Sequence, residues 1–378
     1  MNCLVCGFLG HRKHMVGTTQ YVKTLFENPP ENVSYCLPTS LKTWFQDSPH
    51  FSFLLNQEAV DASVTRYHTC IRPVTDLLKW DVSELEKIRL KPGTEVDVTF
   101  SIFKLMIPSK KPHIAYLNTD YLLTKDPASR NNFSETIHMN TPLAKLYKKT
   151  ILKKIAEAKN TRKLLFRSET AMEKTLKEHP SLADKSCVHY PALELPEFVC
   201  RRDDGVVRLC FVGGDWMHKG LMLLLDVFNG LSKKYDLKLT VVTDSSFAVV
   251  EAGSNVRVFH NLPHDSVFPG IYSEADVFVL PSMRELFGVS ALEAMACGLP
   301  VVMSETYAAA EIVDDGVTGY LTPYGDAKLL QERLVELIED GSLRRRMGDA
   351  GRRKAGEKFS VEAFKAKLSQ VFEECSRS

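Results

Sequence analysis

Two glutamates stand eight residues apart in a stretch of the chain that is otherwise apolar. Glu285 and Glu293 lie in ELFGVSALEAMACGLPVVMSE, and Glu293 is the only charged residue between Glu285 and Glu305. A carboxylate that is removed from water is unstable unless a partner pairs with it or hydrogen-bonds it. The stretch therefore predicts that Glu293 has a partner, which can belong to the protein or to a ligand.

The residues around these glutamates predict a strand, a loop and a helix in succession. The run DVFVLPS over 276–282 is typical of a buried strand, and the apolar spacing over 288–297 is typical of a helix. Glu285 then lies in the loop after the carboxyl end of a strand, where parallel α/β sheets bind ligands. The free amides and the positive dipole end at the start of the following helix favour a bound phosphate.

Glu293 also fits a purely structural role. Ser290 and Glu293 have the spacing of a capping box, in which the glutamate accepts a hydrogen bond from a backbone amide at the helix start. A capping box does not account for Glu285 in the preceding loop. On the local pattern, both interpretations of Glu293 stay open.

A glycine pair and a lysine follow an earlier strand. In FVGGDWMHKGL the strand expected over 208–214 ends in Gly213 and Gly214, and Lys219 precedes a helix. Paired glycines let backbone amides approach a phosphate closely, and the lysine adds a positive point charge. The pattern is not a P-loop, because the G-x-x-x-x-G-K-[ST] spacing is absent. The alternative is a glycine turn followed by a solvated lysine.

The first half of the chain offers two weaker candidates. Gly17 precedes an amphipathic helix directly after the first expected strand, a usual place for a ligand-facing loop in a doubly wound domain. Asp120 follows the strand expected over 112–118 and can orient the hydroxyl of an acceptor. A cap of a helix or a turn is the alternative role for Asp120.

Strands and helices alternate along the chain, which predicts the α/β class. Continuous apolar strands separated by helices form βαβ units, whose parallel sheets are covered on both faces. Strands are expected over 2–8, 32–38, 96–102, 112–118, 163–167, 187–192, 208–214, 237–244, 256–260, 276–282 and 300–304. Helices are expected over 17–27, 83–90, 141–159, 169–178, 218–234, 264–274 and 288–297.

The segment LPEFVCRRDDGV, residues 195–206, is the best candidate for a domain boundary. A proline, four consecutive charges and a glycine separate two apolar runs there. We expect two doubly wound domains, over 1–200 and 201–357, with the binding site in a cleft between them. Residues 358–378 predict a final amphipathic helix, capped by Ser360, whose apolar face needs a packing partner.

The composition argues against several classes of protein. A net charge of +1 gives no support for nucleic-acid binding. The hydrophobic share of 44% and the charged share of 25% are ordinary for a soluble globular protein. No stretch approaches the roughly 18 uncharged apolar residues of a membrane span. The cysteines, nine in number and without framework spacing, predict the reducing cytoplasm.

The segment 142–167 is strongly basic, with nine Lys and Arg residues and one acidic residue, Glu157. A basic amphipathic helix can lie on an anionic membrane surface, and a solvated face is the alternative. The expected localisation is therefore cytoplasmic, with this segment as the candidate for peripheral contact with the inner face of a membrane.

The motifs taken together resemble one family. ADVFVLPSMRELFGVSALEAMACGLPVVMS, FVGGDWMHKG and EIVDDGVTGYLT are similar to stretches of the retaining nucleotide-sugar glycosyltransferases, the glycosyl transferases group 1, which include mannosyltransferases and relatives of glycogen and sucrose synthases. The hallmark of that family is E-x7-E, here Glu285 and Glu293. The resemblance covers residues 205–365 and implies the GT-B architecture, two Rossmann-like domains that face a central cleft. It also implies that the last helix, over 358–378, crosses back onto the first domain.

The resemblance implies a role for each residue of a sugar-nucleotide site. Lys219 would neutralise the diphosphate of the donor, with Gly213 and Gly214 beside it. Glu285 would contact hydroxyls of the sugar and support the positive charge that develops at its anomeric carbon. The phosphate and the sugar would be held by backbone amides near Phe287, Gly288 and Val289.

The remaining roles concern the nucleoside and the acceptor. Glu293 would accept hydrogen bonds from the ribose hydroxyls, and the base would lie near Asn261 and Leu262. Gly17 would contact the donor from the first domain, and Asp120 would lie on the acceptor side. The resemblance implies a hexosyl transfer from a UDP- or GDP-sugar to a glycan, lipid or small-molecule hydroxyl. It implies no cofactor and no metal ion.

The sequence departs from the family pattern at two positions, and two other functions stay open. Many relatives carry an arginine where this chain has Gly214, and Asp215 is an unexpected neighbour for a diphosphate. An epimerase that acts on sugar nucleotides is one alternative, since such enzymes share the two-domain architecture. A subunit that binds a nucleotide sugar without turning it over is the other.

Overall fold

The computed structural model describes two long segments, residues 161–197 and 204–376 apart from a gap at 244–254, and several short ones before them. The short segments are 2–7, 21, 24–25, 28–30, 33–36, 98–102 and 113–117. Gly17, Asp120 and residues 142–160 of the basic segment lie outside the described residues, as do the helices expected over 83–90 and 141–159.

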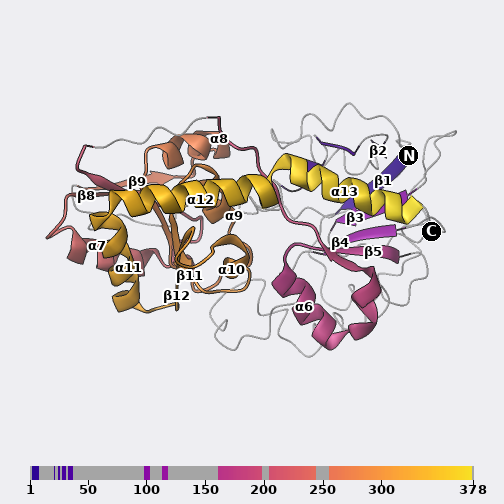
Figure 1. Ribbon diagram of the computed structural model, residues 1–378, viewed down its shortest axis with the longest axis horizontal. Coiled ribbons are helices and arrows are strands. Elements are labelled where there is room, and N and C mark those ends of the chain that lie inside the picture. Colours follow the sequence, from indigo (N-terminus) through magenta and orange to yellow (C-terminus); the bar gives the residue numbers. More distant parts are fainter. Residues whose placement is uncertain are drawn as a thin grey trace. The chain divides into compact units, whose positions relative to one another are not determined.

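The chain divides into two compact units (Figure 1). Unit 1 comprises Met1–Pro191 together with Phe364–Ser378, and unit 2 comprises Ala192–Ala363. The chain therefore passes from unit 1 to unit 2 after Pro191, whereas the sequence predicted this boundary after residue 200. It returns to unit 1 after Ala363, inside the last helix.

Unit 1 contains a six-stranded parallel sheet in the order β2-β1-β3-β4-β5-β6. The strands are β1 (Asn2–Gly7), β2 (Ser34–Cys36), β3 (Val98–Ile102), β4 (His113–Leu117), β5 (Thr161–Phe166) and β6 (Ser186–Val188). A helix α6 (Glu169–Glu178), capped by the Ser168 hydroxyl, and a short 3-10 helix (Pro180–Lys185) connect β5 to β6. The strand bounds lie within two residues of the prediction except at β6, which ends before the expected residue 192, and α6 begins and ends as predicted. Most of the helix expected over 17–27 lies outside the described residues.

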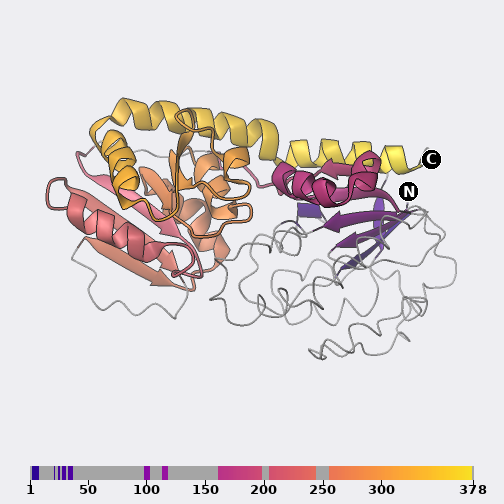
Figure 2. The ribbon, with the colours of Figure 1, turned by 90° about the horizontal axis from the view of Figure 1, so that it is seen from below.

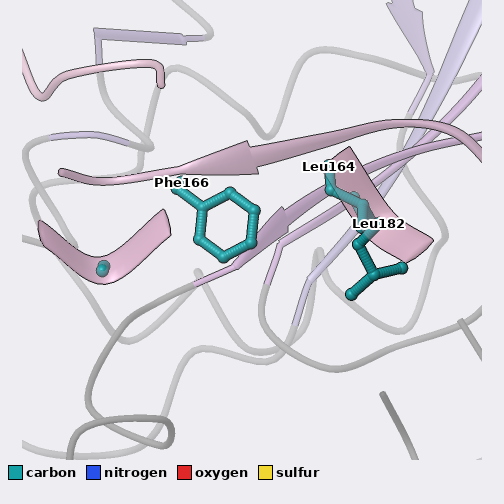
Figure 3. Close-up of a cluster of buried hydrophobic side chains, with 5 residues drawn as sticks. Leu164, Phe166 and Leu182 are labelled. Atoms are coloured by element: carbon teal, nitrogen blue, oxygen red, sulfur yellow. The ribbon is translucent and has the colours of Figure 1, made fainter. Parts of the chain in front are cut away.

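The core of unit 1 forms where this connection covers the sheet. Leu164 and Phe166 are two residues apart on β5, so both point to the same face, where they pack with Leu182 (Figure 3). Leu165, between them, is also fully buried. Burial of successive residues on one strand means that both faces of the sheet are covered, as expected for a parallel sheet.

The last helix, α13 (Val361–Ser376), covers part of unit 1 (Figure 1). Ser360 caps it, since its Oγ accepts a hydrogen bond from the Ala363 amide at 3.2 Å, as the sequence predicted. Lys163 of β5 forms an ion pair with Glu374 near the end of the helix. The buried side chains of one helix face are Phe364, Leu368, Val371, Phe372 and Cys375.

A buried histidine ties this helix to the rest of unit 1. The Nε2 atom of His189 lies 3.2 Å from the carbonyl oxygen of Phe364, and its Nδ1 lies 2.8 Å from the Tyr21 hydroxyl. A carbonyl can only accept, so Nε2 carries the proton and Nδ1 accepts from Tyr21. Burial lowers the pKa of His189 from 6.5 to about 4, although the Phe364 carbonyl opposes this shift.

The free energy of unfolding of unit 1 should therefore fall in mild acid. His189 binds its proton more weakly in the folded state than in the unfolded state, so its stabilising contribution is complete above pH 6.5 and is lost as the pH falls toward 4. The loss is on the order of 3 kcal/mol. Urea denaturation at pH 7.5 and 4.5, followed by circular dichroism, measures it. The His189→Gln variant does not titrate and should show a shallower fall; an equal fall in both proteins would contradict the assignment.

Unit 2 contains the second parallel sheet, in the order β12-β11-β10-β7-β8-β9. Its strands are β7 (Val207–Val212), β8 (Leu237–Thr243), β9 (Val256–His260), β10 (Val277–Leu280), β11 (Val301–Ser304) and β12 (Gly319–Thr322). Its α-helices are α7 (Leu221–Leu231), α8 (His264–Ser266), α9 (Val289–Ala296), α10 (Ala309–Ile312), α11 (Ala327–Glu339) and α12 (Gly341–Phe359). Five strands were predicted to within two residues at each end, whereas β12 was missed.

Helices cover both faces of this sheet. From β7 the chain proceeds outward through β8 to β9, and from β10 it proceeds in the opposite direction to β12. Right-handed crossovers in opposite directions place α7 and α9 on opposite faces. The helix α11 packs on α7 and α12 packs on α9, and α12 runs along unit 2 (Figure 2). The sheet thus reverses its strand order between β7 and β10.

The helix expected over 264–274 is wrong in its middle. The structure has only the short α8 there, then a kinked π-helical turn (Val267–Ile271) in which Phe268 adopts φ −110° and ψ 123°. The reason is Pro269, because a proline disfavours helical backbone at the residue before it.

No helix among the residues that the structure describes is both long and apolar enough to span a bilayer.

Candidate functional site

The two sequence motifs that carry charge lie in neighbouring loops of unit 2. Residues 213–220 follow β7, and residues 281–288 follow β10. These two strands are hydrogen-bonded neighbours, and the strand order reverses between them. In a parallel α/β sheet the carboxyl ends of strands at such a reversal form the usual ligand site. The topology therefore brings both motifs to one edge of the sheet.

The two loops are in direct contact. The amide of Met283 donates a hydrogen bond to the carbonyl of His218 at 2.9 Å. Gly220, with φ +75°, ends the first loop, and a Cβ atom placed on it would lie 2.0 Å from the carbonyl oxygen of Pro281. Only a glycine allows the loops to approach this closely, so Gly220 sets the distance between the two motifs.

Lys219 and Glu285 meet across this contact. The Lys219 ammonium donates to the Glu285 carboxylate in a short ion pair, and the side chains are 25% and 12% exposed. Gly213 makes room for the lysine, since a Cβ there would lie 2.9 Å from Lys219 Cγ. The ion pair thus joins the residue predicted to bind the diphosphate, Lys219, to the residue predicted to bind the sugar, Glu285. Both side chains remain partly exposed to water.

The helix that follows Glu285 begins without a side-chain cap. Gly288, with φ +92°, is the N-cap residue of α9, and as a glycine it has no side chain to cap the first turn. The first amides of a helix have no partner within the helix, so those of α9 remain available to a ligand oxygen. The capping box of Ser290 and Glu293 is therefore absent, because Glu293 turns its carboxylate to other partners.

Glu293 is buried, with 4% of its surface exposed, and both of its carboxylate oxygens have partners. The Tyr272 hydroxyl donates to Oε2 at 2.9 Å, and His264 Nε2 lies 2.7 Å from Oε1. Burial, followed by the charge of Glu293, raises the pKa of Tyr272 well above its ordinary value of 10, so this hydroxyl stays protonated and donates. The protein thus supplies hydrogen-bond partners for the isolated charge of the sequence.

Tyr272 and His264 were missed by the sequence analysis. They lie 21 and 29 residues before Glu293, in the segment between β9 and β10, so no local spacing relates them to it. The segment was interpreted as a helix, and the kink at Phe268 changes which side chains share a face. No motif or local spacing in the sequence identifies them.

The other predicted residues of unit 2 divide into exposed and buried groups. Asn261, with φ +51°, and Leu262 follow the end of β9, at the same carboxyl edge of the sheet, where Asn261 is exposed. Gly214 is exposed in the loop after β7, and Val289 is half-buried. Phe287 is 1% exposed and packs edge-on against Phe359 of α12, with 6.1 Å between ring centroids. Its side chain anchors the loop, so any contact with a ligand comes from its backbone.

Comparison with known proteins places the sequence of unit 2 in context. Residues 199–354 match the family model described as glycosyl transferases group 1. A capsular polysaccharide biosynthesis glycosyltransferase, CapM, from Staphylococcus aureus is 30% identical over 172 residues, which are 43% of this chain and 44% of CapM. A phosphatidyl-myo-inositol mannosyltransferase from Mycobacterium leprae is 31% identical over 170 residues, 43% of this chain and 45% of the relative. The similarity thus spans less than half of these curated relatives.

Solved structures match nearly the whole fold. The Anabaena protein HepE, in complex with UDP-glucose, superposes with a TM-score of 0.68 at 14% identity and covers 99% of both chains. A sucrose-phosphate synthase from Thermosynechococcus elongatus gives 0.67 at 17% identity, covering 99% of this chain and 98% of its own. At these identities the likeness concerns the fold. Residues 199–354 are thus similar to the glycosyl transferases group 1 family, and the chain has the GT-B fold with two parallel-sheet α/β domains.

Proposed function

We propose that this protein is a retaining glycosyltransferase that moves a hexose from a nucleoside diphosphate sugar to a hydroxyl group, without a metal ion. The observation that carries the proposal is the Lys219–Glu285 ion pair between the loops after β7 and β10, beside the uncapped start of α9. The match of residues 199–354 to the family model and the UDP-glucose bound by HepE support a sugar nucleotide as the donor.

The charges at this site suit the departure of a diphosphate. When the bond from the sugar to the diphosphate breaks, negative charge grows on the phosphate oxygens and positive charge grows at the anomeric carbon. Lys219 and the first amides of α9 would stabilise the negative charge, since fixed donors act where charge develops. Glu285 would contact sugar hydroxyls and stabilise the positive charge. The leaving phosphate would accept the proton of the attacking hydroxyl on the same face of the sugar, which gives retention.

The remaining assignments concern parts of the donor and the acceptor. The ribose is proposed to bind Glu293, because each carboxylate oxygen can accept a further hydrogen bond beside the one that the described residues give it. Asn261 and Leu262 are proposed beside the base. Gly17 on the donor side and Asp120 on the acceptor side stay predictions. The cytoplasmic localisation and a peripheral contact with anionic membrane through 142–167 also stay predictions. The acceptor class, a glycan, a lipid or a small molecule, is part of the proposal.

Incubation with UDP- and GDP-sugars and a panel of hydroxyl acceptors tests the function. We expect release of nucleoside diphosphate in the presence of an acceptor, an unchanged rate in EDTA, and a product whose anomeric configuration by NMR equals that of the donor. An epimerised sugar nucleotide formed without acceptor would favour the isomerase alternative. Nucleotide binding without turnover of any donor would favour an inactive binding subunit.

The Glu293→Ala variant should bind nucleotide about tenfold more weakly, because it removes the acceptor for two ribose hydroxyls. Isothermal calorimetry with UDP and GDP measures the affinity. Tyr272→Phe is the matched control, since it removes one buried hydrogen bond of the same cluster and keeps the carboxylate. Equal affinities in wild type and a folded Glu293→Ala variant would rule out the ribose role.

A further inference from the structure

A second basic side chain is held beside Lys219 by a carboxylate of the same loop. His218 Nδ1 lies 2.7 Å from Asp215 Oδ2, and the His218 amide donates to Asp215 Oδ1 at 3.2 Å. The carboxylate can only accept, so Nδ1 carries a proton. Asp215 thus fixes both the backbone and the ring of His218. The second ring nitrogen, Nε2, does not take part in these hydrogen bonds and can bind a ligand.

The backbone of His218 lies at the contact of the two site loops. Its carbonyl accepts the Met283 amide, and the Lys219 amide donates to the Asp215 carbonyl at 2.9 Å, which closes the turn. The His218 side chain is 19% exposed, so it is partly withdrawn from solvent, whereas Asp215 is 54% exposed. The charged and titratable groups of these two loops are Asp215, His218, Lys219, Arg284 and Glu285.

The Lys219–Glu285 pair has little net charge, so a diphosphate bound at these loops would need a further positively charged hydrogen-bond donor. The positive charge of Lys219 is matched by Glu285 before any ligand arrives. The guanidinium of Arg284 lies 5.9 Å from the ring centroid of Tyr307, in the loop after β11 and on the side away from β7. A diphosphate that reaches Lys219 therefore meets little net positive charge from that pair, and His218 is the adjacent basic group.

We propose that His218, oriented by Asp215, is a second side-chain ligand of the donor's diphosphate and stabilises its departure. The inference rests on the proposed function, since it assigns a further residue to the same site. The Nε2–H of the charged imidazole donates a hydrogen bond to a phosphate oxygen. Asp215 is the positioning residue, and its carboxylate faces the imidazole rather than the phosphate, which accounts for an acid in this loop.

The step balances without a proton from His218. The bond from the anomeric carbon to the diphosphate oxygen breaks, and its electrons pass to that leaving oxygen. The oxygen of the acceptor hydroxyl forms the new bond to the anomeric carbon, and its proton passes to the diphosphate. His218 keeps its proton and only donates a hydrogen bond. An imidazole can lose its charge as the pH rises, whereas lysine and arginine stay charged, so donor binding and transfer should depend on pH.

Two measurements test the inference. The first is calorimetric affinity for UDP and GDP, and the second is the pH profile of kcat and of the donor KM between pH 5.5 and 8.5. His218→Gln should lower affinity and kcat/KM at pH 6 about tenfold and flatten the profile, because a neutral amide replaces a charged donor. His218→Arg should keep activity at pH 6 and hold it to pH 8.5. The affinity and activity of Asp215→Asn should lie between those of His218→Gln and wild type. His179 is a histidine of unit 1, so the His179→Gln variant should match wild type.

The outcomes separate this inference from the proposed function. A His218→Gln variant with the affinity and pH profile of wild type would overturn the role of His218 while transfer itself stands. If wild type binds nucleotide but transfers no sugar, the proposed function fails and the affinities of the variants still decide the role of His218. If wild type binds neither nucleotide, both fail.

Discussion

The Lys219→Ala variant is expected to lose at least about 100-fold in kcat/KM for sugar transfer. The lysine is the cation that would face the leaving diphosphate, and its removal also leaves Glu285, only 12% exposed, without its ion-pair partner. That carboxylate would then repel the phosphates instead of sharing a cation with them. Initial rates of nucleoside diphosphate release, with donor and acceptor varied separately, measure the loss.

A double-mutant cycle with Glu285→Gln shows whether the two residues act as a unit. If the pair is the functional unit, the double variant should lose much less than the product of the two single losses. Lys233→Ala, which removes an exposed lysine of the same unit, is the charge control. A Lys219→Ala variant with rates within threefold of wild type would remove the ion pair from the mechanism.

The Gly220→Ala variant is expected to destabilise unit 2 by about 3 kcal/mol or more and to abolish most of the transfer activity. The new Cβ would meet the Pro281 carbonyl oxygen at 2.0 Å, so the loops that carry Lys219 and Glu285 must move apart. Thermal unfolding followed by circular dichroism measures stability, and nucleoside diphosphate release measures transfer.

Gly316→Ala provides a matched control for backbone conformation alone. Gly316 has φ +74°, nearly the φ of Gly220, but a Cβ there would have no atom within 4 Å. Gly316→Ala should therefore lower the free energy of unfolding by only about 1 kcal/mol, from the left-handed backbone conformation alone, and should keep its transfer activity. Equal losses in the two variants would show that backbone conformation, and not the contact between the loops, is what matters at Gly220.

Most strands of unit 2 are predictable because their chemistry is local. Runs such as LCFV in β7 and VFVL in β10 are apolar without alternation, and a sheet covered on both faces requires this. The strand β12 was not predicted because it begins with Gly319, and a glycine at such a position is typical of a turn. In the structure that glycine lets β12 lie against β11, since a Cβ would stand 1.9 Å from the Val301 carbonyl oxygen.

The candidate site was only partly predictable for a related reason. Loop position follows from the order of strands, so Lys219 and Glu285 could each be assigned to a carboxyl end of a strand. That the two residues meet depends on β7 and β10 being neighbours, which is a property of the whole sheet. The partners of Glu293 depend on a kink at Phe268 and on side chains far apart in sequence.

The helix α13 has a consequence for the order in which the molecule is made. Its residues from Phe364 onward belong to unit 1, although all of unit 2 precedes them in the chain. Phe364 packs against Tyr21 and His189, which are synthesised long before it. During translation unit 1 therefore emerges first but lacks part of its core until unit 2 has been made. A ribosome-bound fragment that ends before Phe364 would expose the apolar surface that α13 later covers, and it would be a natural substrate for chaperones.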